Sequence, residues 1–255
     1  MGIADGKRAL IVGVANDKSL AWGIAQELKA QGAEIALTYQ GEVLEKRVRP
    51  LAESIGALVV GELDVTNDVQ IGLTMAELRE LWGGLDMLVH AVAFADREDL
   101  RDRFLTVSRG NFAKALEISA YSLVAISKAL SPLMTGGGVI LTLTYLGSTR
   151  VVTNYNVMGI AKAALEAEVK YLASELGPSK IRVNAISAGA IKTISARGVK
   201  DLSKMLEISA QRAPLRRNTE PAEVADTAVF LGSDLGRGVT GNIIYVDAGF
   251  HIMGL

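Results

Sequence analysis

Short apolar segments alternate along this chain with longer segments of helical periodicity, and this alternation limits the possible folds most strongly. Segments such as RALIVG and EIALTY are apolar on both faces and too short for typical helices. Strands of this kind are typical of parallel sheets that helices cover on both sides. The predicted strands are Arg8–Gly13, Glu34–Tyr39, Ala57–Asp64, Leu85–Ala91, Gly138–Thr144, Ile181–Ser187 and Asn242–Asp247.

The longer segments are predicted helices, and several of them end at glycine or shortly before proline. They are Leu20–Gln31, Glu42–Ile55, Asn67–Trp82, Asn111–Leu130, Tyr155–Leu176 and Ala222–Ser233. Alternation of strands and helices predicts an α/β fold of Rossmann type, a doubly wound parallel sheet of about seven strands with helices on both faces. No linker rich in proline, serine or charge divides the 255 residues, so we expect a single domain over residues 1–255.

Composition narrows the possible sites and partners. The chain has no cysteine, which excludes disulfides and thiolate chemistry, and its two histidines lie far apart, so no metal site is expected. A net charge of −1 gives no reason to expect nucleic acid or an anionic membrane as a partner. Neither a signal peptide nor an apolar run of the ~18 residues that a membrane helix needs is visible. We therefore expect a cytoplasmic protein.

One region departs from the alternation. Between Gly189 and Pro214 no strand is predicted, only a loop with one or two short helices. The loop follows the sixth predicted strand, at the edge of the sheet where open α/β folds bind their ligands. Residues at about 190–211 are therefore either an ordinary crossover or a mobile lid over a substrate, and the pattern leaves both open.

The turns after the first two strands suit a dinucleotide. Gly13 permits close approach of a ligand, and Ser19 is placed to cap the helix that begins near Leu20, whose N-terminus would face a pyrophosphate. The glycine pattern is incomplete and on its own also fits a plain strand–turn–helix unit. Gln40, at the end of the second strand, can bind ribose hydroxyls but offers a 2′-phosphate no charge, which favours NADH over NADPH.

The next two strand ends carry further candidates. Asp64, followed by Val65, could contact adenine at the end of the third strand, or could cap the following helix. Small residues in Ala91–Ala93 would let a cofactor lie against the backbone. His90, directly before them, is interpreted as a structural histidine with satisfied hydrogen bonds rather than as a catalyst.

Two tyrosines and a lysine stand out in the second half. Tyr145 precedes Tyr155 by ten residues, and Lys162 follows Tyr155 by seven. If the helix begins near Tyr155, then Tyr155 and Lys162 share one helix face, about 10 Å apart along the axis. An amphipathic helix that carries both by coincidence would give the same pattern.

Taken together, these motifs resemble the short-chain dehydrogenase/reductase superfamily and, within it, the bacterial NADH-dependent enoyl-(acyl carrier protein) reductases. The matching stretches extend over essentially the whole chain and include GVANDKSLAWGIA, VHAVAFA, ISAYS, NYNVMGIAKAALEA and IRVNAISAGAIKT. Two departures are visible: Ala91–Ala93 where family members often have serine and glycine, and Ala190 where proline is frequent. Both keep small or apolar character.

The resemblance implies a role for each matching position. The implied catalytic residues are Tyr145, Tyr155 and Lys162. Tyr155 is the implied active-site tyrosine, Lys162 also binds the nicotinamide ribose, and Tyr145 is the second tyrosine, near the acyl chain. The implied cofactor contacts are Gly13, Ser19, Leu20, Gln40, Asp64, Val65, Ala91, Lys162, Ile191 and Thr193. The implied substrate contacts are Ala93, Tyr145, Tyr155 and Met158, with residues 190–211 as the substrate-binding loop.

The spacing of tyrosine and lysine distinguishes two reactions within the superfamily. Carbonyl reductases of the superfamily carry the lysine four residues after the tyrosine, where this chain has Gly159. A lysine at seven couples less to the tyrosine, so the phenol stays a neutral donor suited to stabilising an enolate. The resemblance therefore implies reduction of enoyl thioesters with NADH in fatty acid biosynthesis, with a 3-oxoacyl thioester or other carbonyl reductase as the alternative. It also implies an enoyl-acyl carrier protein as substrate and a homotetramer.

Overall fold

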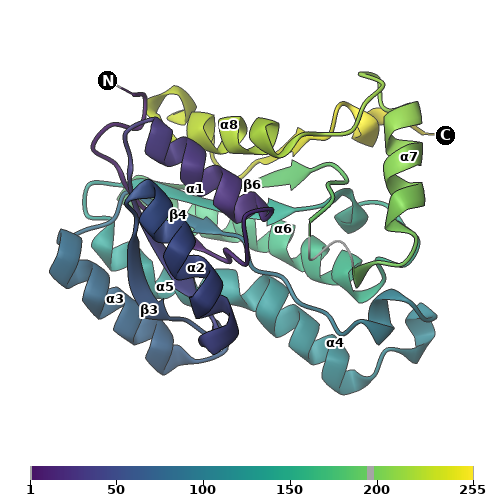
Figure 1. The fold of residues 1–255 in the computed structure, drawn as a ribbon, viewed down its shortest axis with the longest axis horizontal. Helices are drawn as coiled ribbons and strands as arrows, with labels where there is room; N and C mark the ends of the chain where they lie inside the picture. Colours follow the sequence, from purple (N-terminus) through teal and green to yellow (C-terminus); the bar gives the residue numbers. More distant parts are fainter. Residues whose placement is uncertain (1, 194–197, 255) are drawn as a thin grey trace.

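In the computed structural model, which describes residues 2–193 and 198–254, seven parallel strands form one sheet in the order β3-β2-β1-β4-β5-β6-β7 (Figure 1). The predicted α/β fold and strand number are confirmed. The order reverses between β1 and β4, and such switch points open a crevice at the carboxyl ends of the strands. The strands are β1 (Arg8–Val12), β2 (Glu34–Tyr39), β3 (Leu58–Glu62), β4 (Met87–His90), β5 (Gly138–Thr144), β6 (Ile181–Ala188) and β7 (Ile243–Val246).

Helices cover both faces of the sheet, as the strand pattern predicts. On one face the buried core includes α1 (Leu20–Ala30), α2 (Gly41–Ile55) and α8 (Pro221–Gly232). On the other it includes α3 (Asp68–Trp82), α5 (Ser122–Leu130) and α6 (Val157–Leu176). Alternate residues of β1 enter the two cores, which is why this strand is apolar throughout.

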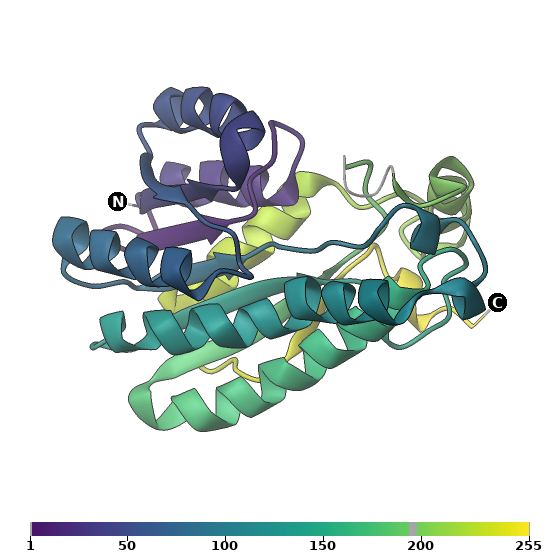
Figure 2. The same ribbon diagram turned by 90° about the horizontal axis from the view of Figure 1, so that it is seen from below.

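α7 and the turns before α4 lie at one end of the molecule (Figures 1 and 2). The remaining helical elements are η1 (Glu98–Leu100), η2 (Phe104–Thr106), α4 (Arg109–Leu116), η3 (Glu117–Tyr121), η4 (Ser131–Leu133), η5 (Leu146–Ser148), η6 (Gly177–Ser179), α7 (Leu202–Arg212), η8 (Asp234–Gly236) and η9 (Phe250–Ile252). No helix of the described residues is long and apolar enough to cross a membrane.

The predicted helix over residues 111–130 is interrupted by a turn of π-helix. The segment begins as α4, passes through η3 and continues as α5. Within η3, Ser119 exchanges hydrogen bonds with the backbone of Phe94: its Oγ accepts from the nitrogen at 2.9 Å and donates to the carbonyl at 3.1 Å. The extra residue of the π turn directs Ser119 toward this loop, and such turns are frequent at functional sites.

The predicted start of the helix at Tyr155 is wrong. The helix α6 begins at Val157, because Asn156 takes φ 43° and ψ −120°, which no helix continues. Tyr155 therefore precedes the helix, and it does not share a helix face with Lys162. Both residues nevertheless line the same cleft, described below.

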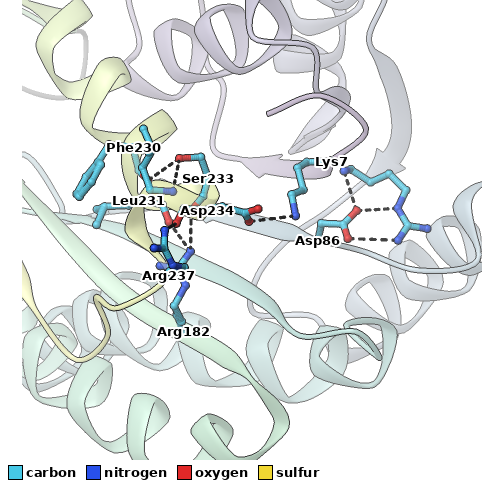
Figure 3. A network of polar contacts seen from close by, with 10 residues as sticks. Lys7, Asp86, Arg182, Phe230, Leu231, Ser233, Asp234 and Arg237 are labelled. Atoms are coloured by element: carbon cyan, nitrogen blue, oxygen red, sulfur yellow. Dashed lines mark hydrogen bonds and ion pairs between the residues drawn. The ribbon is translucent and has the colours of Figure 1, made fainter. Parts of the chain in front are cut away.

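A polar network holds the amino ends of the strands, opposite the crevice (Figure 3). Arg8 at the start of β1 donates through Nε to Asp86, just before β4, at 2.8 Å. Lys7 pairs with Asp234 at 3.8 Å, and Arg182 at the start of β6 donates to the carbonyl of Leu231 at 2.6 Å. These contacts join β1 to the start of β4, and they join β1 and β6 to the end of α8 and the turn after it.

Candidate active site

A cleft of about 930 Å³ lies along the carboxyl ends of the strands, and every predicted site residue lines it. Its volume is near the upper end of the range for small-molecule sites. The predicted residues that the structure brings together are Gly13, Ser19, Leu20, Gln40, Asp64, Val65, Ala91, Ala93, Tyr145, Tyr155, Met158, Lys162, Ile191 and Thr193. Their individual roles stay predictions, and the geometry below supports them.

At the turn after β1 only glycine fits. Gly13 has φ 108°, and a Cβ there would lie 2.2 Å from the carbonyl oxygen of Ala91. The amide of Ala91 donates in turn to the carbonyl of Val12 at 2.9 Å. The turn therefore passes close to β4, and it leaves the N-terminus of α1 open toward the cleft.

Ser19 takes the N-cap position of α1 but does not cap it as predicted. Its hydroxyl donates to the carbonyl of Asn16 at 2.8 Å instead of accepting from the first turn of the helix. Asn16 itself lines the cleft, and its Nδ2 is buried without a partner among the described residues. A buried donor beside a helix N-terminus suits an anionic ligand such as a pyrophosphate.

Gln40 and Asp64 lie together where the second and third strands end. The carboxylate of Asp64 accepts from the backbone and the hydroxyl of Thr66, at 2.9 and 2.8 Å. Burial alone would raise the pKa of Asp64, but these bonds and one with Gln40 outweigh it, so the pKa falls below its ordinary value. The cap of α3 is Asn67, so Asp64 does not cap the helix and stays ionised at the cleft.

His90 fits the structural interpretation given to it from sequence. Its ring is fully buried, with Nδ1 2.9 Å from the hydroxyl of Thr142 and Nε2 2.8 Å from that of Ser122. Burial, together with the positive charge of Lys162, lowers the pKa of His90 to about 3, so the ring is neutral. It does not line the cleft.

Tyr145 and Tyr155 form an edge-to-face pair in the cleft. Their ring centroids are 4.9 Å apart at an interplanar angle of 67°. Burial, with a contribution from Asp247, raises the pKa of Tyr145 to about 12. Burial, with contributions from Tyr145 and Glu166, raises the pKa of Tyr155 further above its ordinary range. Both phenols therefore keep their protons at neutral pH and can donate hydrogen bonds.

Lys162 is a buried cation that opens onto the cleft. Its Nζ donates to the carbonyl of Leu143 at 2.8 Å, and only 5% of the residue is exposed. Burial lowers the pKa of Lys162 to about 8, an effect that the carboxylate of Glu166 partly offsets. Glu166 accepts a buried hydrogen bond from Thr144 at 2.7 Å. The main chain of β5 thus fixes the lysine from one side.

A small apolar cluster closes the end of the cleft near the tyrosines. Leu100, Met158 and Val199 form its buried part, and Tyr155 and Met205 pack against them. Leu100 was not predicted, because the charged segment around it gives no apolar periodicity. Val199 and Met205 belong to the predicted loop at 190–211, of which residues 194–197 lie outside the described part of the chain.

Comparison with known proteins places these features in one family. The sequence model described as "Enoyl-(Acyl carrier protein) reductase" matches residues 13–251. An NADH-dependent enoyl-(acyl carrier protein) reductase of Rickettsia felis is 53% identical over 253 residues, covering 99% of this chain and 97% of the relative.

Solved structures of such reductases agree with the fold over the whole chain. The Bacillus cereus enzyme, in complex with NADP⁺ and indole naphthyridinone, is 52% identical with a TM-score of 0.98, covering 100% of both chains. The enzyme of Anaplasma phagocytophilum, in complex with NAD, is 50% identical with a TM-score of 0.95, covering 100% of this chain and 95% of the other.

Proposed function

Because the chain belongs to the enoyl-(acyl carrier protein) reductase family of the short-chain dehydrogenase/reductase superfamily, we propose that it reduces enoyl thioesters with NADH in fatty acid biosynthesis. The bond reduced is the trans-2 C=C bond, and the substrate is carried by an acyl carrier protein. The observation that carries the proposal is the pair of Tyr155 and Tyr145 in a cleft that also holds the buried Lys162.

The described residues fit NADH. The glycine turn at Gly13, the unpartnered Asn16 amide and the start of α1 would hold the pyrophosphate, while Gln40 and Asp64 would hold the adenosine. Val65, Ala91, Ile191 and Thr193 would line its path, and Lys162 would bind the nicotinamide ribose. Bound NADH supplies the hydride that adds to the β-carbon of the thioester.

Tyr155 stabilises the charge that develops on the substrate. As the β-carbon gains the hydride, negative charge builds on the thioester carbonyl oxygen, and uptake of a proton at the α-carbon then completes the reduction. A phenol whose pKa is raised by burial stays protonated, and it donates a hydrogen bond to that oxygen. Tyr145 packs on its edge and faces the acyl chain with Ala93 and Met158.

Reduction of a carbonyl group is the alternative, and no feature of the site favours it. Gly159 stands where carbonyl reductases have the lysine, and the amine of Lys162 is bound to the main chain of β5. Purified protein tested with NADH and NADPH against trans-2-enoyl and 3-oxoacyl thioesters distinguishes the two. Oxidation of NADH by enoyl thioesters is expected, and turnover of 3-oxoacyl thioesters alone would overturn the proposal.

Assembly as a homotetramer in the cytoplasm is part of the same proposal. Ile160 and Tyr171 on α6 expose 43% and 79% of their surfaces, with the exposed Ala163 and Ala167 between them. An apolar helix face of this kind suits packing against a second copy about a symmetry axis. Light scattering after gel filtration should give four times the chain mass of 27.0 kDa.

A further inference from the structure

The backbone around Tyr155 is held in a conformation that few residues adopt. Asn154 and Asn156, on either side of it, have φ of 67° and 43°. Asparagine enters this region more readily than most residues, but the conformation still costs free energy that the surroundings must offset. The side-chain amide of Asn156 donates to the backbone carbonyls of Asp99 and Asp102, at 2.8 and 3.0 Å. The side-chain amide of Asn154 donates to the backbone carbonyl of Lys200 at 3.2 Å.

Two glycines lie against the tyrosine from the other direction. A Cβ built on Gly147, in the turn η5, would lie 2.4 Å from Cδ1 and 2.8 Å from Cε1 of the Tyr155 ring. A Cβ built on Gly159, in the first turn of α6, would lie 2.7 Å from the carbonyl oxygen of Gly147 and 3.8 Å from the ring. Neither glycine has a positive φ, so the requirement for glycine at these positions is space and not backbone conformation.

We propose that Gly147 and Gly159 are positioning residues that seat the ring of Tyr155, and that their contact with each other excludes a lysine from the fourth position after this tyrosine. The proposal rests on the proposed function for its kinetic readout. A side chain introduced in place of Gly159 would have to enter the space of the Gly147 carbonyl, so any larger residue displaces η5. Because η5 carries Gly147 against the ring, such a displacement also moves the phenol.

The fixed position of the Tyr155 ring and the spacing of seven residues between Tyr155 and Lys162 then have one steric cause. With the fourth position closed by the contact between α6 and η5, the lysine that serves the cleft stands three residues later. There its amine meets the carbonyl of Leu143 at the end of β5. The phenol is held by packing and by the two asparagine clamps, independently of Lys162.

The first experiment replaces Gly147 with alanine. Gly147→Ala forces the ring to move, and a misplacement of about 1 Å can lower turnover on the order of 10²-fold. We expect kcat for an enoyl thioester to fall by that factor, while the dissociation constant for NADH stays within about twofold. Gly177→Ala is the matched control, since nothing lies within 4 Å of a Cβ at this glycine, just past the end of α6. A Gly147→Ala enzyme with the turnover of Gly177→Ala would overturn the proposal.

A double-mutant cycle separates positioning from general damage to the fold. In the Tyr155→Phe background the phenol hydroxyl is gone, so adding Gly147→Ala should lower kcat no further. A purely structural role predicts the same loss in both backgrounds, because the effects of independent changes add. Equal losses in the two backgrounds would therefore refute the assignment.

Changes at Gly159 test the exclusion of lysine and provide a second route should Gly147→Ala not fold. Gly159→Ala should lower kcat with little change in NADH binding, and Gly159→Lys should lower it more and give no 3-oxoacyl reductase activity. A Gly159→Lys enzyme with normal enoyl turnover would show that the contact does not exclude lysine.

A readout independent of activity distinguishes failure of this proposal from failure of the proposed function. With carbon-labelled tyrosine, the ring resonance absent from Tyr155→Phe is that of Tyr155. It should shift in Gly147→Ala and Gly159→Ala but not in Gly177→Ala, whatever substrate the enzyme reduces. An unshifted resonance in both variants would sink the positioning role even if enoyl reduction is confirmed.

Discussion

The two halves of the cleft are built in different ways. The half at the ends of β1–β3 consists of short turns that directly follow regular strands, with Gly13, Gln40 and Asp64 each within two residues of a strand end. The half at the ends of β4–β6 consists of irregular backbone: the π turn η3, the turn η5 and two asparagines at positive φ. Regular strand ends therefore supply the first half, and tertiary contacts hold the second.

The difference follows from what each half is proposed to do. A pyrophosphate and an adenosine can be bound by backbone amides and a few polar side chains that need no strained geometry. A phenol that must meet a developing negative charge needs a fixed position, and strain held by the surroundings is one way to fix it. Substitutions in the second half should accordingly change kcat by a larger factor than substitutions in the first half change the dissociation constant of the cofactor.

The largest effect is expected from Tyr155→Phe. Removing one hydrogen-bond donor to a developing oxyanion lowers turnover by about 10²- to 10³-fold, while the ring and its contact with Tyr145 remain. Steady-state rates with a saturating enoyl thioester measure this loss, and fluorescence titration should show unchanged NADH binding. Tyr121→Phe, at a tyrosine 58% exposed and outside the cleft, is the control. Equal rates in the two variants would show that turnover does not depend on the phenol that the second half of the cleft holds in place.

A smaller effect, on binding, is expected from Lys162→Ala. The loss of a charge-assisted hydrogen bond to the nicotinamide ribose should weaken NADH binding by roughly 10- to 100-fold. Because Lys162 contacts the main chain of β5 and not the tyrosines, kcat at saturating NADH should fall less than in Tyr155→Phe. Lys170→Ala, at an exposed lysine on the same helix, should bind NADH normally. If only kcat fell, the role of Lys162 would be proton transfer and not cofactor binding.

Most of the fold and the first half of the cleft could be predicted from the sequence. β2 and β5 have the predicted bounds, since turn residues on either side of a continuous apolar run mark both ends of a buried strand. Gly13 and Gln40 were identified because they directly follow strands. Parallel strands bring their carboxyl ends to one edge, so residues distant in sequence could be placed together without side-chain detail.

The second half was predicted less completely, for a physical reason. Asn156 delays the start of the helix to Val157 through its own φ and ψ, and its side-chain amide is held by the carbonyls of Asp99 and Asp102, which are distant in sequence. The sequence around Asn156 does not predict those hydrogen-bond partners. Leu100 was missed likewise, because a single apolar residue among charges has no periodicity and its burial comes from tertiary contacts.

The pH dependence of NADH binding should sharpen the role of Lys162. Its pKa is lowered to about 8, so the amine is charged below that pH and neutral above it. Affinity for NADH should therefore be full near neutral pH and fall as pH rises through the pKa, by about tenfold, the difference between a charged and a neutral donor. The charged group that acts on Lys162 is Glu166 on its own helix, since the ring of His90 on β4 is neutral in this range.

Changing Glu166 tests the assignment of that transition. Glu166 raises the pKa of Lys162, so Glu166→Gln should move the loss of affinity to lower pH. Titrations with NADH from about pH 6.5 to about pH 9.5 cover both sides of the lowered pKa of about 8. A transition that stays in place in Glu166→Gln, or that persists in Lys162→Ala, would belong to another group.

The smallest effect is expected in the first half, from Gln40→Arg. Gln40 is exposed at the end of β2, and two basic residues of α2, Lys46 and Arg49, are each paired with an acid one turn earlier. An arginine at this position would add an exposed charge for a 2′-phosphate, which strengthens NADPH binding by up to about fivefold, the value of a surface ion pair. The carboxylate of Asp64 beside it limits this gain in NADPH affinity.

Gln40→Glu should weaken NADPH binding while NADH binding changes little, because a carboxylate repels the phosphate but accepts from ribose hydroxyls. If both variants bind NADPH alike, selection between the cofactors does not lie at the end of β2, and the first half of the cleft contributes affinity without discrimination.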